Sequence, residues 1–161
     1  MSKRIGMIYR LIPKKSEEVY AFDGISTDDI SGLSNSMLDA FRDTEDFEDE
    51  TLEDLNEEIQ SVVYGTFGIF ISDASFQIKQ NTEIASAILI NLYEGNPLVS
   101  ELFTKKKYMN LGMASSLLKN SINVLLKLGY ENLTLNVHPR NVGAVNLYKK
   151  LDLQSYNLVH I

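Results

Sequence analysis

The sequence predicts a mixed α/β protein in which one sheet is covered by helices. Short apolar or alternating runs, which are typical of strands, alternate along the chain with apolar residues at helical spacing. The chain has 161 residues, of which 44% are hydrophobic and 23% are charged. This is a globular composition and a length suited to one core, so we expect residues 1–161 to form a single domain.

The N-terminal part of the chain is expected to form two strands and then a helix. The stretch from Arg4 to Ile12 is rich in Ile, Tyr and Met, and Glu18 to Ile25 is expected to be a second strand. Ser26 or Thr27 can then cap a helix, with acidic residues in its first turn that suit the helix dipole. Apolar residues recur at helical spacing as far as Phe41, which predicts a helix up to that point.

A second helix and three strands are expected to follow. The helix is expected to begin at Thr51, which together with Asp54 resembles a capping box. Short apolar runs at Thr66–Ser72, Thr82–Tyr93 and Leu98–Thr104 predict the three strands.

The C-terminal part of the chain alternates between helix and strand. Gly112 to Leu128 is a strongly amphipathic segment, and Gly129 ends it as a C-cap glycine does. A strand is expected over residues 133–137, a helix over 141–151 and a final strand over 153–161. The predicted order of elements is therefore β, β, α, α, β, β, β, α, β, α, β.

Charge is unevenly distributed along the sequence. The formal net charge of −7 divides into −12 over residues 1–97 and +5 over residues 98–161. Ten of the sixteen residues from Asp43 to Glu58 are acidic. Such a run could attract a cationic substrate such as an amine, or it could be a solvated loop and the outer face of a helix, and the sequence leaves both interpretations open.

The composition excludes several kinds of site. The chain has no cysteine, so it has no disulfide, thiolate nucleophile or cysteine zinc site. With only His138 and His160 in addition, we expect no metal. The acidic total argues against nucleic acid as a partner. No apolar run has the length of a membrane span, and the first residues lack the pattern of a signal peptide, so we expect no membrane partner and a cytoplasmic location.

One segment combines a strand end, a basic run and a helix start. After the expected strand at Leu98–Thr104, Lys105 to Lys107 add positive charge, and Gly112 opens directly into the long helix. The amides of residues 110–115 would be unpaired there, and small side chains at 112, 114, 115 and 116 would let phosphate oxygens approach them. The segment is neither a Walker loop nor a dinucleotide fingerprint, and by spacing alone an ordinary strand–helix turn remains open.

A second motif follows at residues 133–153, and together the two resemble the acetyl-coenzyme A (acetyl-CoA) binding half of the GCN5-related N-acetyltransferase (GNAT) superfamily. Residues 109–114, Met-Asn-Leu-Gly-Met-Ala, match the glycine and the Gly/Ala position of the family's Gln/Arg-x-x-Gly-x-Gly/Ala loop. The family's later signature is Asn-x-x-Ala-x-x-Leu-Tyr followed by Leu-Gly-Phe, and the residues that fall on it are Asn141, Ala144, Leu147, Tyr148 and Leu151.

The sequence departs from the family pattern at three places. Met109 replaces the usual Gln or Arg, which removes one side-chain contact to phosphate. Asp152 and Leu153 replace Gly-Phe. The sequence ends at Ile161, where the family usually has a further strand, so the sheet edge is expected to be shorter or to be completed by another chain, as in a homodimer.

The resemblance implies a fold, a co-substrate and a partner. The fold is a single mixed, mostly antiparallel sheet flanked by helices, with two central parallel strands, 98–104 and 132–138, that splay apart. Acetyl-CoA is the implied co-substrate, and a small-molecule or peptide amine is the implied acceptor. Residues 1–97 would form the acceptor side and residues 98–161 the acetyl-CoA side. The implied cofactor-binding residues are Leu102, Phe103, Thr104, Met109, Asn110, Leu111, Gly112, Met113, Ala114, Ser115, Asn141 and Tyr148.

The resemblance also implies roles in direct transfer of acetyl to an amine. Tyr148 matches the position that protonates the leaving thiolate, since a phenol of ordinary pKa near 10 is protonated at pH 7. Glu101, on the strand beside the thioester, could take the proton of the amine through a water. The alternatives are a core tyrosine and a cross-sheet ion pair. Ser75 is a further candidate to meet the acceptor. A non-catalytic acyl-CoA-binding or interaction module, and a scaffold whose motifs match by chance, remain open as functions.

Overall fold

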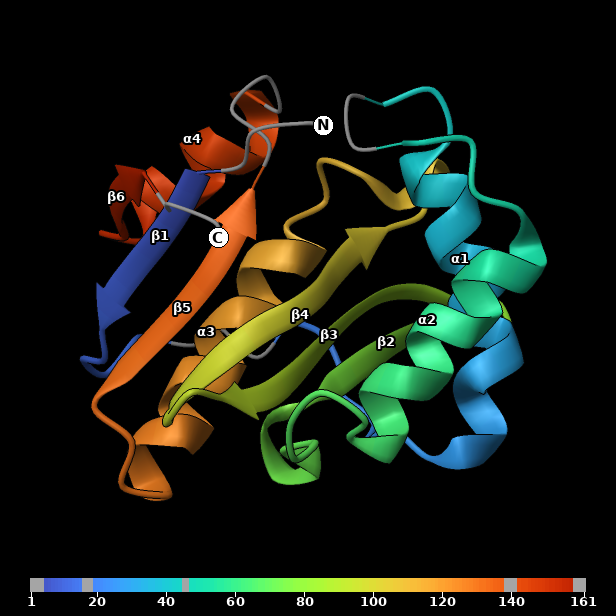
Figure 1. Cartoon of the computed structure of the whole chain (residues 1–161). Coiled ribbons are helices and arrows are strands. Elements are labelled where there is room, and N and C mark those ends of the chain that lie inside the picture. The colour runs from blue at the N-terminus through green and yellow to red at the C-terminus, as the bar shows by residue number, and fades with distance from the viewer. Residues whose placement is uncertain (1–4, 16–18, 45–46, 138–141, 158–161) are drawn as a thin grey trace.

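The computed structural model describes residues 5–15, 19–44, 47–137 and 142–157. Figure 1 shows the arrangement of the elements. Three short 3-10 turns, η1 (Thr27–Asp29), η2 (Ser72–Ala74) and η3 (Lys106–Tyr108), interrupt the loops. The strands and helices in chain order are β1 (Ile5–Arg10), α1 (Ile30–Phe41), α2 (Leu52–Tyr64), β2 (Phe76–Gln80), β3 (Glu83–Tyr93), β4 (Asn96–Thr104), α3 (Met113–Lys127), β5 (Asn132–Val137), α4 (Val142–Lys150) and β6 (Gln154–Asn157).

The described strands form one mixed sheet in the order β2-β3-β4-β5-β1-β6. Within the described sheet only β4 and β5 pair in parallel, and all other neighbouring strands are antiparallel. Each face of the sheet carries its own buried apolar cluster. α1 and α2 pack on one face around Leu33 and Ile59, whereas α3 packs on the other around Leu117 and Ile122, together with Tyr148 of α4. The predicted fold class is confirmed.

The sequence signals for helix ends hold in the structure. Thr51 and Asp54 form the predicted capping box, because the Asp54 amide donates to Thr51 Oγ1 at 3.1 Å and the Thr51 amide donates to Asp54 Oδ2 at 2.9 Å. Ser26 caps the turn η1, whose Asp29 carboxylate accepts from the Ser26 amide at 2.8 Å, and η1 continues directly into α1. The α2, α3 and α4 helices likewise lie where the periodicity predicted them.

Two predicted strands are wrong. The described part of 18–25 makes only an isolated bridge, between Asp23 and Gln77, and its Phe22 packs by its ring against Phe76 at 6.1 Å between centroids. The segment 66–72 makes one bridge to β3 and then turns into η2. A Cβ built on Gly68 would lie 2.1 Å from the Leu92 carbonyl oxygen, so the glycine permits a close backbone approach rather than a regular ladder.

The strand that the sequence pattern missed is β2. Its five residues, Phe-Gln-Ile-Lys-Gln, carry too few apolar side chains to stand out. Gln77 is nevertheless buried, because its amide nitrogen donates to the Gly24 carbonyl at 2.8 Å and to Asp29 Oδ2 at 3.0 Å. Burial of β2 therefore depends on polar contacts with the segment before α1, which no local pattern reveals.

Two strands lie beyond β5 in the described sheet. β1 lies between β5 and β6, with six paired positions on β5 and four on β6. The sequence predicted a short edge or an edge supplied by another chain. In the described chain the four-residue strand β6 forms this edge and β1 lies inside it, which places the first described residues beside the last ones (Figure 1).

Candidate active site between strand β4 and helices α3 and α4

The parallel strands β4 and β5 separate soon after they meet. Their pairing covers two positions, Leu98 with Thr134 and Val99 with Leu135, and β4 then continues to Thr104. A bulge lies at the same point, because the register of β3 on β4 shifts between Leu89 and Ile90. Bulges bend and twist a strand locally. The backbone of β4 after Val99 therefore lies beyond its last described pair with β5.

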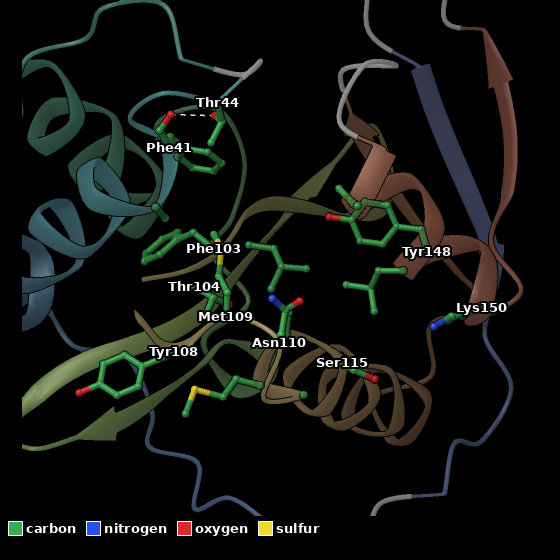
Figure 2. Close-up of a pocket in the computed structure, with 18 of the residues that line it drawn as sticks. Phe41, Thr44, Phe103, Thr104, Tyr108, Met109, Asn110, Ser115, Tyr148 and Lys150 are labelled. Carbon is green, nitrogen blue, oxygen red and sulfur yellow. Dashed lines mark hydrogen bonds between the residues drawn. The ribbon is translucent and has the colours of Figure 1, made fainter. Parts of the chain in front are cut away.

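A cavity of about 700 Å³ opens where the strands separate (Figure 2). Four parts of the chain line it: the end of β4, the loop leading into α3 with the first residues of α3, helix α4, and the end of α1. These residues are Leu102, Phe103, Thr104, Tyr108, Met109, Asn110, Gly112, Met113, Ala114, Ser115, Gly143, Ala144, Leu147, Tyr148, Lys150, Ala40, Phe41, Asp43 and Thr44.

The start of α3 presents backbone donors to this cavity. Gly112 is the N-cap with φ +80°, and Asn110 also has a left-handed backbone, with φ +64°. The Ser116 amide donates to the Gly112 carbonyl at 3.0 Å, so the helical amides of residues 113–115 precede the first helical hydrogen bond. A Cβ built on Gly112 meets nothing within 4 Å, which leaves room over these amides. The helix start is suited to an anion such as a phosphate.

Tyr148 and Glu101 are both buried but differ in their relation to the cavity. Tyr148 belongs to the α3-side core and lines the cavity, and Figure 2 shows its hydroxyl end pointing inward, toward the side where Phe103 and Thr104 lie. Glu101 is 8% exposed and does not line the cavity. On β4 it lies two residues before Phe103, and it is paired opposite Leu89 of β3. Phe103 and Leu89 both belong to the apolar cluster on the face that α1 and α2 cover. By strand alternation, Glu101 therefore shares their face.

A family model for the acetyltransferase (GNAT) family matches residues 34–153, most of the chain. The chain belongs to this family. The match includes α1 from residue 34 onward, α2 and the whole of the cavity lining. None of the curated proteins matches the sequence.

Solved structures of other GNAT proteins share the fold. A GNAT enzyme from Sphaerobacter thermophilus superposes with a TM-score of 0.72 at 17% identity, over 97% of this chain and 49% of its own. The ribosomal-protein-S18-alanine N-acetyltransferase of Escherichia coli gives 0.64 at 19%, over 83% and 76%. A GNAT acetyltransferase from Brucella melitensis in complex with acetyl-CoA gives 0.63 at 11%, over 87% and 88%. This chain thus spans about half the length of the Sphaerobacter protein.

The cavity brings together nearly all the residues that the GNAT motifs single out. Of the twelve cofactor-binding candidates, ten line it. Leu111 is exposed and lies outside the lining, although its carbonyl accepts a hydrogen bond from the Tyr20 hydroxyl. Asn141 and His138 lie outside the described residues. Ser75 is fully buried and bridges backbone groups, so it does not face this cavity.

The lysine run of the GNAT loop has a different role from the one expected. Lys105 and Lys107 place their ammonium groups 2.5 and 2.6 Å from the carboxylate of Glu83, and the Tyr108 hydroxyl donates to it at 3.0 Å. Hydrogen bonds from Lys105 and then Lys107 lower the pKa of Glu83 to about 2, and Glu83 in turn raises the pKa of Lys107. These two lysines hold the loop to β3, and each is paired with the carboxylate of Glu83.

Sequence reasoning missed two parts of the lining. Lys150 lines the cavity from the last turn of α4, two residues after Tyr148 (Figure 2). A cation close to the family signature was a usable signal for it. The end of α1 contributes Phe41, Asp43 and Thr44, and the Thr44 hydroxyl donates to the Phe41 carbonyl at 2.7 Å. No motif marks this turn.

The described residues also bear on metal binding and membrane insertion. Among the described residues, no three His, Asp or Glu side chains are grouped so that they could hold a metal ion. In the same part of the chain, no helix combines the length and the apolar character needed to cross a bilayer.

Proposed function

We propose that this chain is an acetyl-CoA-dependent N-acetyltransferase, with residues 1–161 forming one domain. The observation that carries the proposal is the single cavity in which the open amides of α3, the separated end of β4 and the hydroxyl of Tyr148 meet. Each of these parts suits one portion of a coenzyme A thioester.

The start of α3 would hold the pyrophosphate. The backbone amides of Gly112 to Ser115 supply donors, the helix dipole favours negative charge, and the small side chains of Ala114 and Ser115 allow close approach. The unobstructed space over Gly112 fits a phosphate. Met109 cannot donate a side-chain hydrogen bond, so in this site the backbone would carry the recognition.

The end of β4 would bind the pantetheine arm and place the thioester. The backbone groups of Leu102, Phe103 and Thr104 lie beyond the last described pairing with β5, so an extended amide chain can pair with them as a further strand would. A backbone amide of this segment would stabilise the oxyanion that forms when the amine attacks the carbonyl. The Brucella structure similar to this chain contains acetyl-CoA, which supports the choice of co-substrate.

The proton transfers are assigned to two residues. The amine nitrogen attacks the thioester carbonyl, the C–S bond breaks, and Tyr148 donates its phenolic proton to the departing sulfur. Its hydroxyl end points into the cavity from α4, opposite β4, which supports this role. Glu101 would take the proton of the amine through a water, because it is a buried carboxylate on the strand that holds the thioester.

The acceptor is proposed to be a small-molecule or peptide amine. Asp43 lines the cavity at the start of the acidic segment, which supports a cationic acceptor. One similar structure is a ribosomal-protein-S18-alanine N-acetyltransferase, so peptide amines belong among the acceptors to be tested.

A non-catalytic acyl-CoA-binding module is the second candidate. Met109 at the usual Gln or Arg position and the pairing of Lys105 and Lys107 with Glu83 favour it, because both reduce the polar groups available to phosphate. The retained hydroxyl of Tyr148 favours the enzyme.

Calorimetric titration with acetyl-CoA, coenzyme A and ATP tests the proposal, followed by a thiol-release assay with a panel of amines. We expect micromolar binding of acetyl-CoA, much weaker binding of ATP, and thiol release with at least one amine. Binding without release for any amine would support the second candidate. Absence of binding at millimolar acetyl-CoA would overturn both.

A further inference from the structure

The geometry points to Lys106 as a positioning residue that couples the two walls of the cavity. One wall is the loop and helix start at residues 108–115, proposed above to hold coenzyme A. The other is the turn at the end of α1, formed by Phe41, Asp43 and Thr44, on the proposed acceptor side. The inference rests on the proposed function, because it assigns the two walls to two ligands.

Lys106 makes three hydrogen bonds to the end of α1, more than 60 residues away in sequence. Its backbone amide donates to Asp39 Oδ2 at 2.8 Å. Its ammonium donates to the Asp39 carbonyl at 2.8 Å and to the Arg42 carbonyl. The last carbonyls of a helix have no helical partner, and a cation is favoured there by the helix dipole. Lys106 therefore both caps α1 and fixes the turn that follows it.

Lys106 is also close in sequence to the other wall, formed by residues 108–115. It is the first residue of η3, and Tyr108, Met109 and Asn110, which follow within four positions, all line the cavity. On the α1 side, Asp43 follows Arg42 directly and has a left-handed backbone, with φ +65°. The Thr44 amide and hydroxyl both bond to the Phe41 carbonyl, at 3.0 and 2.7 Å. The Arg42 carbonyl, which accepts from the Lys106 ammonium, is therefore one residue from Phe41 and from Asp43, which line the cavity on the α1 side.

The two lysines next to Lys106 in the sequence contact β3. Lys105 and Lys107 both contact Glu83 at the start of β3, and within the described residues neither is hydrogen-bonded or ion-paired to α1. The run of three lysines is therefore divided: the outer two hold the loop to the sheet, and Lys106 holds it to α1. Ordering of the loop by a ligand would be transmitted to the α1 turn through Lys106, and ordering of the turn would favour the loop by the same free energy.

Hydrogen–deuterium exchange with and without coenzyme A tests this inference. In the wild-type chain we expect coenzyme A to slow exchange in two segments, 109–116 and 38–44. Lys106→Met removes the ammonium but keeps most of the stem, so slowing in 38–44 should fall by at least about half while coenzyme A still binds and still slows exchange in 109–116. Lys106→Arg keeps donors for the carbonyls and should restore the response.

Lys107→Met is the matched control, because it removes a lysine from the same turn without touching α1. It should leave the response of segment 38–44 at the wild-type level. Should Lys106→Met not fold, Asp39→Ala removes one of the three hydrogen bonds and is expected to give a smaller loss in the same direction. An unchanged response of 38–44 in Lys106→Met, or in its substitute Asp39→Ala, would overturn the inference while leaving the proposed function intact. No slowing in 109–116 in the wild type would instead contradict the proposed function.

Discussion

The two walls of the cavity differ in the chemical groups that form them. On the α3 and α4 side, the groups suited to bind a ligand are backbone amides at a helix start, short side chains and one buried phenol. On the α1 side, the wall is an irregular turn held by side-chain contacts from Lys106 and Thr44. The groups of the first wall follow from local backbone geometry at the start of a helix. The second wall depends on contacts between parts of the chain that are more than 60 residues apart in sequence.

The largest effect is expected from Tyr148→Phe. It removes the proposed proton donor but keeps the ring that packs in the core, so thiol release should fall by about 10²-fold or more. The affinity for acetyl-CoA should change by no more than the net value of one hydrogen bond, about 1 kcal/mol. Stopped-flow or endpoint thiol detection measures the first quantity and calorimetry the second. The exposed Tyr64→Phe is the control. Unchanged turnover would show that the Tyr148 hydroxyl on α4 takes no part in catalysis.

The next prediction distinguishes an effect on the proposed backbone phosphate site from an effect on the stability of α3. Gly112→Ala adds a Cβ over the amides of α3, whereas Gly129→Ala adds one at the other end of the same helix. Both positions have left-handed backbones, with φ +80° and +92°, and open space, so both variants should lose about 1 kcal/mol or more of folding stability. Only Gly112→Ala should weaken binding of acetyl-CoA, by about 10-fold. Equal binding in the two variants would contradict a backbone phosphate site.

A smaller effect is expected from Lys150, the basic side chain in the described lining of this wall. Lys150 lines the cavity and Lys149 does not, although the two are adjacent. Lys150→Gln should weaken coenzyme A binding by about 0.5–1 kcal/mol at low salt, and the difference should shrink as salt is raised. Lys149→Gln should leave binding unchanged. Repeating the titration with dephospho-coenzyme A shows which phosphate Lys150 meets. Loss of affinity in Lys149→Gln alone would reverse the assignment.

The smallest effect concerns Glu83, which holds the loop before α3 to β3. The pKa of Glu83 is lowered to about 2 by Lys105 and Lys107, from an ordinary value of 4.5. Its carboxylate therefore stabilises the fold fully above pH 4.5, and this contribution is lost as the pH falls from 4.5 toward 2. The midpoint of thermal unfolding of Glu83→Gln should lie below that of the wild type at pH 6, and the gap should narrow below pH 4.5. A gap that is constant down to pH 3 would refute the ion-pair explanation.

The same contrast explains how much the sequence could predict. Gly112, the small residues after it and Tyr148 belong to spaced motifs, so the α3 and α4 wall was found from the sequence, as were the helix caps. The α1 turn was missed because Lys106 meets carbonyl oxygens, which every residue has, and nothing near Arg42 marks it as the acceptor. β2 was missed for a similar reason, since Gln77 is buried by contacts with Gly24 and Asp29. Sequence patterns predict strands but not which strands pair, so they did not place β1 between β5 and β6.

The most direct test of the central claim is a nitrogen–proton correlation spectrum of the labelled protein titrated with coenzyme A. The claim is that backbone amides at the start of α3 and the end of β4 form the binding site. We predict that the amides of Gly112 to Ser115 shift most, followed by those of Leu102 to Thr104, and that the amides at the far end of α3 near Gly129 do not move. Saturating shifts that leave residues 112–115 unchanged would contradict the claim.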